Sequence, residues 1–259
     1  MKIAISGKGG VGKSTIASIL ALMLAEQDEK VLALDADPDA NLASALGITE
    51  EDQKGIVTIG QRMDIIEERT GAKVGTYGQM FNLNPKVSDL AEKFAYNHRG
   101  VALLVLGAAH KGGGGCACPE NTFIKAFVDD LVLNKDETLL MDMEAGIEHL
   151  GRATAQSVDV LLVVVEPGQR SFDCAREIER MSDEIGLDNL LYIGSKVTGP
   201  EDEVYIREGL GDRPLIACIP YSENLRRADR DGSCPYDALD EQEKALYSAI
   251  LDAIRASVK

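Results

Sequence analysis

A glycine-rich run near the start of the sequence carries the clearest chemistry in the chain. Residues 7–14 read Gly-Lys-Gly-Gly-Val-Gly-Lys-Ser, which fits the pattern G-x-x-x-x-G-K-[ST]. An apolar run over residues 2–6 precedes it, and a helix-forming stretch follows directly. Glycines let backbone N–H groups turn inward around phosphates, and the N-terminus of a helix favours anions. The alternative is a chance glycine turn, but the strand–loop–helix context favours a nucleotide site.

The side chains of this run would have distinct roles at a bound nucleotide. Lys13 would reach the β- and γ-phosphates, and Ser14 would ligate Mg²⁺. The nucleotide-binding residues predicted from this run are Gly7, Lys8, Gly9, Gly10, Val11, Gly12, Lys13, Ser14 and Thr15.

Two acidic segments follow apolar runs and would complete the site. Asp142 ends one such run, where its carboxylate would hold Mg²⁺ directly or through water, and Gly146 beyond it would sense the γ-phosphate. Asp37, in the acidic segment over residues 35–39, would face the γ-phosphate and orient water. The alternative for either carboxylate is an ordinary helix cap at the end of a strand. Because both carboxylates accompany the glycine-rich run, we favour a Mg²⁺ site made by Ser14, Asp37 and Asp142 over two helix caps.

A pair of cysteines, Cys116 and Cys118, follows four consecutive glycines and precedes a proline. Thiolates are soft ligands that suit Zn²⁺, Ni²⁺, Cu(I) or iron–sulfur chemistry. Two thiolates make only half of a four-ligand site, which a symmetric dimer would complete at its two-fold axis. The alternatives are two small residues in a tight turn and a redox-active dithiol.

The elements that must position these residues follow from short apolar runs that alternate with longer amphipathic stretches. This pattern predicts a doubly wound α/β fold, with a mostly parallel sheet of about seven strands and ligands at the carboxyl ends of the strands. The predicted strands are Lys2–Ser6, Lys30–Leu34, Val101–Leu106, Thr138–Met143, Val160–Val165, Leu190–Gly194 and Leu215–Ile219. The predicted helices are Ser14–Glu26, Asn121–Leu133, Ile147–Ser157, Ser171–Ile185, Glu201–Glu208 and Glu241–Ala256. We expect one domain over residues 1–259, with a partly helical insertion at about 49–100.

Composition narrows the function classes. The 259 residues include 27 Lys and Arg against 43 Asp and Glu, a net charge of −16. This acidity argues against nucleic-acid binding and against electrostatic attachment to anionic lipid. No apolar stretch reaches the roughly 18 residues that a membrane span needs, and no targeting signal is visible at the start. Five unevenly spaced cysteines do not suggest a disulfide framework, so we expect a cytoplasmic protein.

The additional Lys8 inside the glycine-rich run identifies a family. With this lysine the sequence resembles the deviant Walker A (SIMIBI) ATPases of the P-loop NTPase fold, a group that includes MinD, ParA, nitrogenase iron protein and ArsA. The resemblance implies that Lys8 crosses a nucleotide-sandwiched dimer interface to the partner's phosphates, while Lys13 has the ordinary role. It also implies that Asp37 orients water and that Asp142 is associated with the metal, which makes these four the predicted catalytic residues. The alternative for Lys8 is a solvated loop lysine.

Within that group the sequence is most similar to the CooC-type maturation ATPases, and the Cys116/Cys118 pair is what singles out this branch. The segments that carry the likeness are Gly7–Ser14, Asp35–Asp39, Lys111–Cys118, Met141–His149 and Ile219–Tyr221. The resemblance implies slow, switch-like ATP hydrolysis to ADP by a homodimer that forms on nucleotide or metal binding. It implies an intersubunit metal site at the cysteine pair, for Ni²⁺ or Zn²⁺, and nickel insertion into carbon monoxide dehydrogenase as the client.

One departure from the group concerns the nucleobase. Many relatives carry Asn-Lys after the sixth strand, whereas this chain has Ser195-Lys196. We therefore expect Lys196 at the nucleotide, and backbone groups near Pro220 to contribute to base recognition.

Three alternative functions remain open. The same machinery would serve another nickel client, such as acetyl-CoA synthase. A MinD- or ParA-type positioning ATPase would need a basic membrane helix or a basic DNA-binding surface, but residues 241–259 carry no net charge. An iron–sulfur carrier would need a cysteine within residues 146–156 or a C-x-x-C pair nearer the C-terminus, and the sequence has neither.

Overall fold

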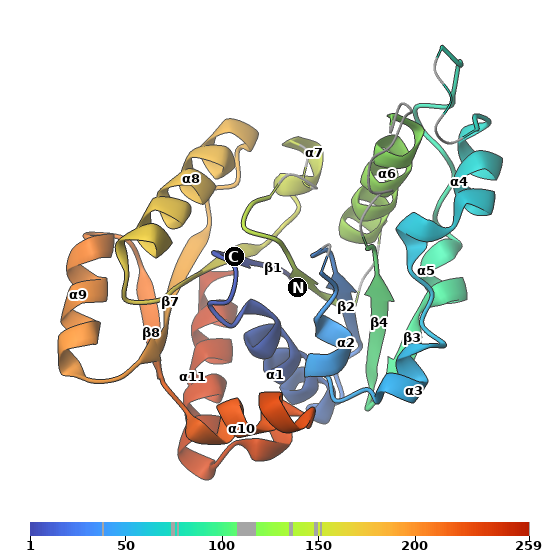
Figure 1. Cartoon of the computed structure of the whole chain (residues 1–259). Helices are drawn as coiled ribbons and strands as arrows, with labels where there is room; N and C mark the ends of the chain where they lie inside the picture. Colours follow the sequence, from blue (N-terminus) through green and yellow to red (C-terminus); the bar gives the residue numbers. More distant parts are fainter. Residues whose placement is uncertain are drawn as a thin grey trace.

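The computed structural model describes residues 1–37, 39–73, 76, 78–107, 118–134, 137–147, 150 and 152–258. Its centre is an eight-stranded sheet in the order β3-β4-β2-β5-β1-β6-β7-β8 (Figure 1). All neighbouring strands are parallel except β3 and β4, which are antiparallel. The strands are β1 (Lys2–Gly7), β2 (Val31–Asp35), β3 (Tyr96–His98), β4 (Val101–Val105), β5 (Thr138–Asp142), β6 (Val160–Val165), β7 (Leu190–Val197) and β8 (Leu215–Pro220).

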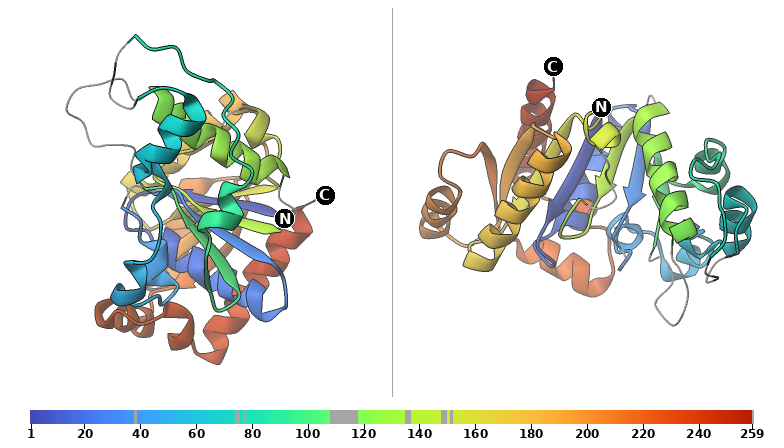
Figure 2. Two further views of the ribbon diagram at one scale, coloured as in Figure 1. Left: turned by 90° about the vertical axis from the view of Figure 1, so that its right-hand side faces the viewer. Right: turned by 90° about the horizontal axis from the view of Figure 1, so that it is seen from above.

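Helices cover both faces of the sheet, so two hydrophobic cores form, one on each side (Figure 2). This explains why the central strands are buried along their whole length and read as continuous apolar runs. One core includes side chains of α1 (Lys13–Glu26), α2 (Leu42–Ala45), η2 (Pro235–Ala238) and α11 (Glu241–Ser257). The other core includes side chains of α4 (Met63–Thr70), α5 (Leu90–Phe94), α6 (Cys118–Asn134), α7 (Arg152–Ala155), α8 (Gln169–Ile185) and α9 (Pro200–Leu210).

The predicted doubly wound fold is confirmed, and each of the seven predicted strands is present within a few residues of its expected bounds. The sheet has one strand more than predicted, because β3 pairs with β4 at the edge. The helix predicted over Ile147–Ser157 is shorter, since only Arg152–Ala155 is helical among the described residues of that stretch. A helix that was not predicted, α10 (Glu223–Asp231), begins at Ser222, whose hydroxyl accepts a hydrogen bond from Leu225 N.

The segment over residues 49–100 forms several short elements, which lie on the side of the molecule where β3 ends the sheet (Figure 1). They are α3 (Glu50–Gln53), η1 (Ile59–Gln61), α4, α5 and β3. Within the described part of the chain, no helix has both the length and the apolar character to cross a membrane.

Candidate functional site

The glycine-rich loop joins the carboxyl end of β1, in the middle of the sheet, to the start of α1. Gly10 and Gly12 have φ angles of 79° and 101°, which side chains rarely permit, so glycine is needed at both positions. A Cβ at Gly7 would lie 2.4 Å from the Val164 carbonyl oxygen on β6. Gly12 begins α1 without a side-chain cap, and the first turn holds no acidic residue. The N-terminus of α1 is therefore suited to an anion.

Lys13 is buried, with 6% of its side chain exposed. Its Nζ lies 4.0 Å from Asp37 Oδ2, which joins the loop to the acidic segment after β2. Asp37 in turn accepts a hydrogen bond from Asp39 N at 3.0 Å, so the turn that carries it is held locally. A buried ammonium beside the phosphate-binding loop is placed where a γ-phosphate would neutralise it.

Asp35 and Asp142 lie side by side at the carboxyl ends of β2 and β5 and are both fully buried. Burial raises the pKa of Asp35 to about 7, and repulsion from Asp142 adds to the rise. Burial also raises the pKa of Asp142 to about 6, although the nearby Ser14 hydroxyl and Lys13 ammonium oppose it. Two buried carboxyl groups at one edge therefore store unfavourable electrostatic energy when both are ionised.

The donor set around Asp142 fits Mg²⁺. Both of its carboxylate oxygens lack a hydrogen-bond partner within the part of the chain that the structure describes. Ser14 contributes a hydroxyl oxygen close by, and hard oxygen donors are what Mg²⁺ prefers. The same cation would relieve the repulsion between Asp142 and Asp35.

Backbone and hydroxyl contacts hold the two acidic loops against β1. Ser6 Oγ on β1 donates to the carbonyl oxygens of Glu144 (2.8 Å) and Gly146 (3.0 Å), in the loop after β5. Ala36 N donates to the Asp142 carbonyl oxygen at 2.9 Å, which links the loop after β2 to β5. These contacts connect the loop after β5 to the strand that precedes the phosphate-binding loop, and the loop after β2 to β5.

Lys8 forms an ion pair within its own chain. Its Nζ lies 2.7 Å from Glu166 Oε1, directly after β6, and 37% of the lysine side chain is exposed. Glu166 is fixed in turn because its backbone N–H donates to Ser171 Oγ at the start of α8. In this conformation the lysine is held beside the loop by Glu166.

A cavity of about 640 Å³ extends from the phosphate-binding loop toward β7, β8 and α10. This volume is in the range of small-molecule sites. Lys196, near the end of β7, has a φ angle of 58°, and its Nζ donates to the Gly10 carbonyl oxygen and so braces the loop. The cavity is lined by Gly9, Gly10, Gly12, Lys13, Ser14, Thr15, Asp37, Ser195, Lys196, Pro220, Tyr221 and Arg226, among others.

Most of the predicted nucleotide and Mg²⁺ residues are thus brought together at one edge of the sheet. Four of them, Gly7, Lys8, Val11 and Asp142, do not line the cavity, and Val11 and Asp142 are fully buried. Cys116 lies outside the described residues, and of Cys118 only its backbone at the start of α6 is described. The metal site therefore stays a prediction, and the rest of the described chain holds no cluster of three or more potential metal ligands.

No role was predicted from the sequence for three residues that shape the site, namely Ser6, Asp35 and Glu166, although Asp35 lies in the acidic segment over residues 35–39. Asp35 follows the last apolar residue of β2 as Asp142 follows that of β5, and this shared position was the available signal. Ser6 and Glu166 gave no comparable signal, because their roles depend on contacts with residues more than 130 positions away.

Comparison with known proteins agrees with this geometry. Residues 2–236 match the model of the CobQ/CobB/MinD/ParA nucleotide binding domain. The chain is 40% identical over 257 residues to the carbon monoxide dehydrogenase accessory protein CooC of Rhodospirillum rubrum, covering 98% of this chain and 97% of that protein. It is 43% identical over 232 residues to an ATP-binding protein of Methanocaldococcus jannaschii, covering 88% of each.

The fold is shared with solved structures as well. The MinD cell division protein of Aquifex aeolicus matches with a TM-score of 0.66 and 21% identity, covering 99% of this chain and 98% of that chain. The predicted resemblance to the MinD/ParA group and to its CooC branch is thereby confirmed. The chain belongs to the CobQ/CobB/MinD/ParA family of nucleotide-binding proteins.

Proposed function

We propose that this protein is an ATP-hydrolysing maturation factor that couples a nucleotide-driven dimer switch to nickel binding or insertion into carbon monoxide dehydrogenase. The observation that carries the proposal is the 40% identity to a carbon monoxide dehydrogenase accessory protein over 98% of the chain. The assembled phosphate-binding loop, Lys13 and the acidic loops support the ATPase part of it. With its acidic composition, we expect the protein to act in the cytoplasm, without nucleic acid or membrane as partners.

ATP would bind with its phosphates on the backbone N–H groups of the loop and the start of α1. Lys13 would lie against the β- and γ-phosphates and leave its present position near Asp37. Asp37, released from that contact, would orient the attacking water. Mg²⁺, held by Ser14 and Asp142 with Asp37 nearby, would neutralise charge on the phosphate oxygens. Gly146, which Ser6 positions, would report the loss of the γ-phosphate to the loop after β5.

The dimer switch would use Lys8. In the present conformation Lys8 is paired with Glu166 of its own chain, so reaching a partner's phosphates requires that this pair opens. A phosphate offers more negative charge than one carboxylate, and this difference would drive the exchange when ATP is bound. Hydrolysis would return the lysine to Glu166 and relax the dimer.

The nickel part of the proposal concerns Cys116 and Cys118. Two such pairs, brought together by the dimer axis, would supply four thiolates to one Ni²⁺ or Zn²⁺ ion. By linkage, if the metal strengthens dimerisation by some factor, dimerisation strengthens metal binding by the same factor.

The test is molar mass by light scattering together with metal content, for protein without ligand, with ATP·Mg²⁺ and with Ni²⁺. We expect a metal-dependent dimer with one ion for two chains, lost in Cys116→Ser and Cys118→Ser. Cys218→Ser, which removes a half-buried thiol on β8, is the matched control and should keep the metal. Full metal content in the Cys118→Ser variant would place the metal elsewhere and remove this part of the proposal.

A further inference from the structure

The chain between α4 and α5 forms a loop with two strongly exposed apolar side chains. Within this loop, residues 78–86 are called the apolar loop below. Met80 is 95% exposed and Leu83 is 76% exposed, more than any other large hydrophobic side chain in the described part of the protein. Figures 1 and 2 show that the loop extends away from α4 and beyond the body of the molecule. Single exposed apolar residues are common, but two within four residues of one loop call for an explanation.

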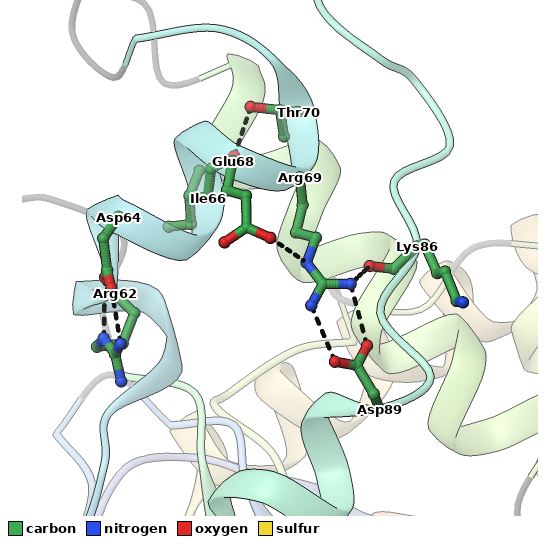
Figure 3. A network of polar contacts seen from close by, with 8 residues as sticks. All are labelled: Arg62, Asp64, Ile66, Glu68, Arg69, Thr70, Lys86 and Asp89. Carbon is green, nitrogen blue, oxygen red and sulfur yellow. Dashed lines mark hydrogen bonds and ion pairs between the residues drawn. The ribbon is translucent and has the colours of Figure 1, made fainter.

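The base of the loop is clamped by Arg69 of α4 (Figure 3). The guanidinium makes two hydrogen bonds to the Asp89 carboxylate, at 3.0 and 2.9 Å, and one to the Lys86 carbonyl oxygen at 3.0 Å. Its pairing with Asp89 holds the pKa of that carboxyl below its usual range. Ala72 and Val87, at the two ends of the loop, are buried. One arginine therefore joins the end of α4 to the returning chain.

Hydrogen bonds inside the loop fix its shape further. The Gln79 side-chain amide accepts from Lys73 N (3.0 Å) and donates to the carbonyl oxygens of Lys73 (2.9 Å) and Thr76 (3.2 Å). Asn82 N donates to the Thr70 carbonyl oxygen at 2.7 Å. None of these contacts uses the side chain of Met80 or Leu83. Polar residues therefore hold the shape of the loop, while Met80 and Leu83 are left exposed to solvent.

The charge of this stretch contrasts with that of the protein. Residues 71–88 contain Lys73 and Lys86 and no acidic residue, in a chain with 43 acidic residues among 259. At the average frequency of Asp and Glu in this chain, a stretch of this length would hold about three acidic residues. Both lysine side chains are exposed. The loop is thus a cationic, apolar projection on an acidic molecule, and a binding surface that complements it is acidic with an apolar recess.

We propose that the apolar loop is the docking surface for the enzyme under maturation, which receives Met80 and Leu83 in an apolar recess bordered by carboxylates. This inference rests on the proposed function for the existence of such a client. A bilayer is a poorer fit, because a molecule with a net charge of −16 is repelled by anionic lipid. A second copy of the chain is also a poorer fit, because a two-fold contact between the loops would place lysine against lysine.

The test is the affinity of the full-length protein for immobilised, nickel-free carbon monoxide dehydrogenase, measured by biolayer interferometry with ATP·Mg²⁺. The variant is Met80→Ser with Leu83→Ser, and the matched control is Val204→Ser, which removes an exposed apolar side chain on α9. We expect the double variant to bind about tenfold more weakly or worse, and the control to bind as the wild type does. Lys86→Glu should weaken binding mainly at low salt. ATP hydrolysis by the isolated protein should be unchanged in every variant, which shows that they are folded.

The outcomes separate the two proposals. Equal binding by the double variant and the wild type would overturn the docking role and leave the proposed function standing. A wild type that does not bind the client in any nucleotide state would overturn the proposed client and the docking role with it. A double variant that binds the client normally but loses dimerisation, or loses binding to vesicles with 30% anionic lipid, would assign the loop to a second copy or to a bilayer and overturn the proposal.

Discussion

Lys8 Nζ and Glu166 Oε1 are 2.7 Å apart within one chain, so the lysine that is expected to act across a dimer interface is paired internally. The pair is partly exposed on both sides, and pairs of this kind contribute about 0–1 kcal/mol. Such a pair is strong enough to bias the position of the lysine and weak enough to be replaced by a phosphate.

The first prediction concerns this pair. Glu166→Gln removes the charge that holds Lys8, so ATP-dependent dimerisation should become more favourable, by up to about fivefold for each protomer. Light scattering across a concentration series with ATP·Mg²⁺ measures it. Glu179→Gln, which breaks an ion pair with Arg213 on the α8–α9 side, is the control and should leave dimerisation unchanged. Weaker dimerisation of the Glu166→Gln variant would show that the glutamate belongs to the dimer contact instead.

The second prediction concerns pH. Asp35 and Asp142 have raised pKa values in the folded chain, about 7 and about 6, so the folded state binds protons more tightly than the unfolded state. The stability that comes from this tighter proton binding is therefore fully present below about pH 4, the ordinary pKa of a carboxyl group. It is lost as the pH rises through the folded-state pKa values to about 7. In urea unfolding without nucleotide, the wild type should lose up to about 4 kcal/mol from these two carboxyl groups between pH 5 and 8.

The Asp35→Asn variant isolates this effect. It should show a flatter dependence of the unfolding free energy on pH, whatever its absolute stability. Mg²⁺ with ATP should also flatten the wild-type profile, because a bound cation favours the ionised carboxylates. Identical pH slopes for Asp35→Asn and the wild type would contradict the assignment.

The third prediction concerns Ser6, whose hydroxyl contacts the carbonyl oxygens of Glu144 and Gly146. Ser6→Ala should lower the rate of ATP hydrolysis several-fold with little change in ATP affinity, because the loop after β5 loses its attachment while the phosphate-binding loop is intact. The loss in stability should be about 1 kcal/mol. Ser182→Ala, on α8, removes a buried hydroxyl that also donates to a carbonyl and should change stability alone. A parallel loss of hydrolysis in both variants would mean that stability, not loop position, is responsible.

The fourth prediction concerns Lys196, whose Nζ contacts the Gly10 carbonyl oxygen. Lys196→Met should weaken ATP binding about tenfold, since one charge-assisted hydrogen bond to the loop is lost. Isothermal titration calorimetry with ATP measures the change. Lys244→Met, on α11, is the control and should bind ATP as the wild type does. Unchanged ATP affinity of the Lys196→Met variant would mean that the hydrogen bond from Lys196 to Gly10 does not help the loop to bind ATP.

The strands were predictable because parallel strands buried on both faces give apolar runs with polar ends. β3 was not, because its three residues are polar or half-buried and depend on pairing with β4. α10 was missed because only Ala228 on it is buried, so no apolar stripe marks it in the sequence.

The phosphate-binding loop was predictable for a different reason, since its function requires particular residue types at fixed spacing. The choice between Asp35 and Asp37 was harder. Both follow the same strand, and only the register of β2 on β5 shows that Asp35 faces Asp142 while Asp37 faces Lys13. Long-range contacts such as Lys8 with Glu166 leave no local pattern at all.

Whether ATP drives this protein to mature a nickel enzyme can be measured by activating purified, nickel-free carbon monoxide dehydrogenase. The measurement is CO oxidation gained with time after adding limiting Ni²⁺, ATP·Mg²⁺ and either the wild type or Lys8→Ala. We expect fast activation with the wild type and ATP, and slow activation with ADP or with Lys8→Ala. Equal activation in all of these mixtures would contradict this expectation.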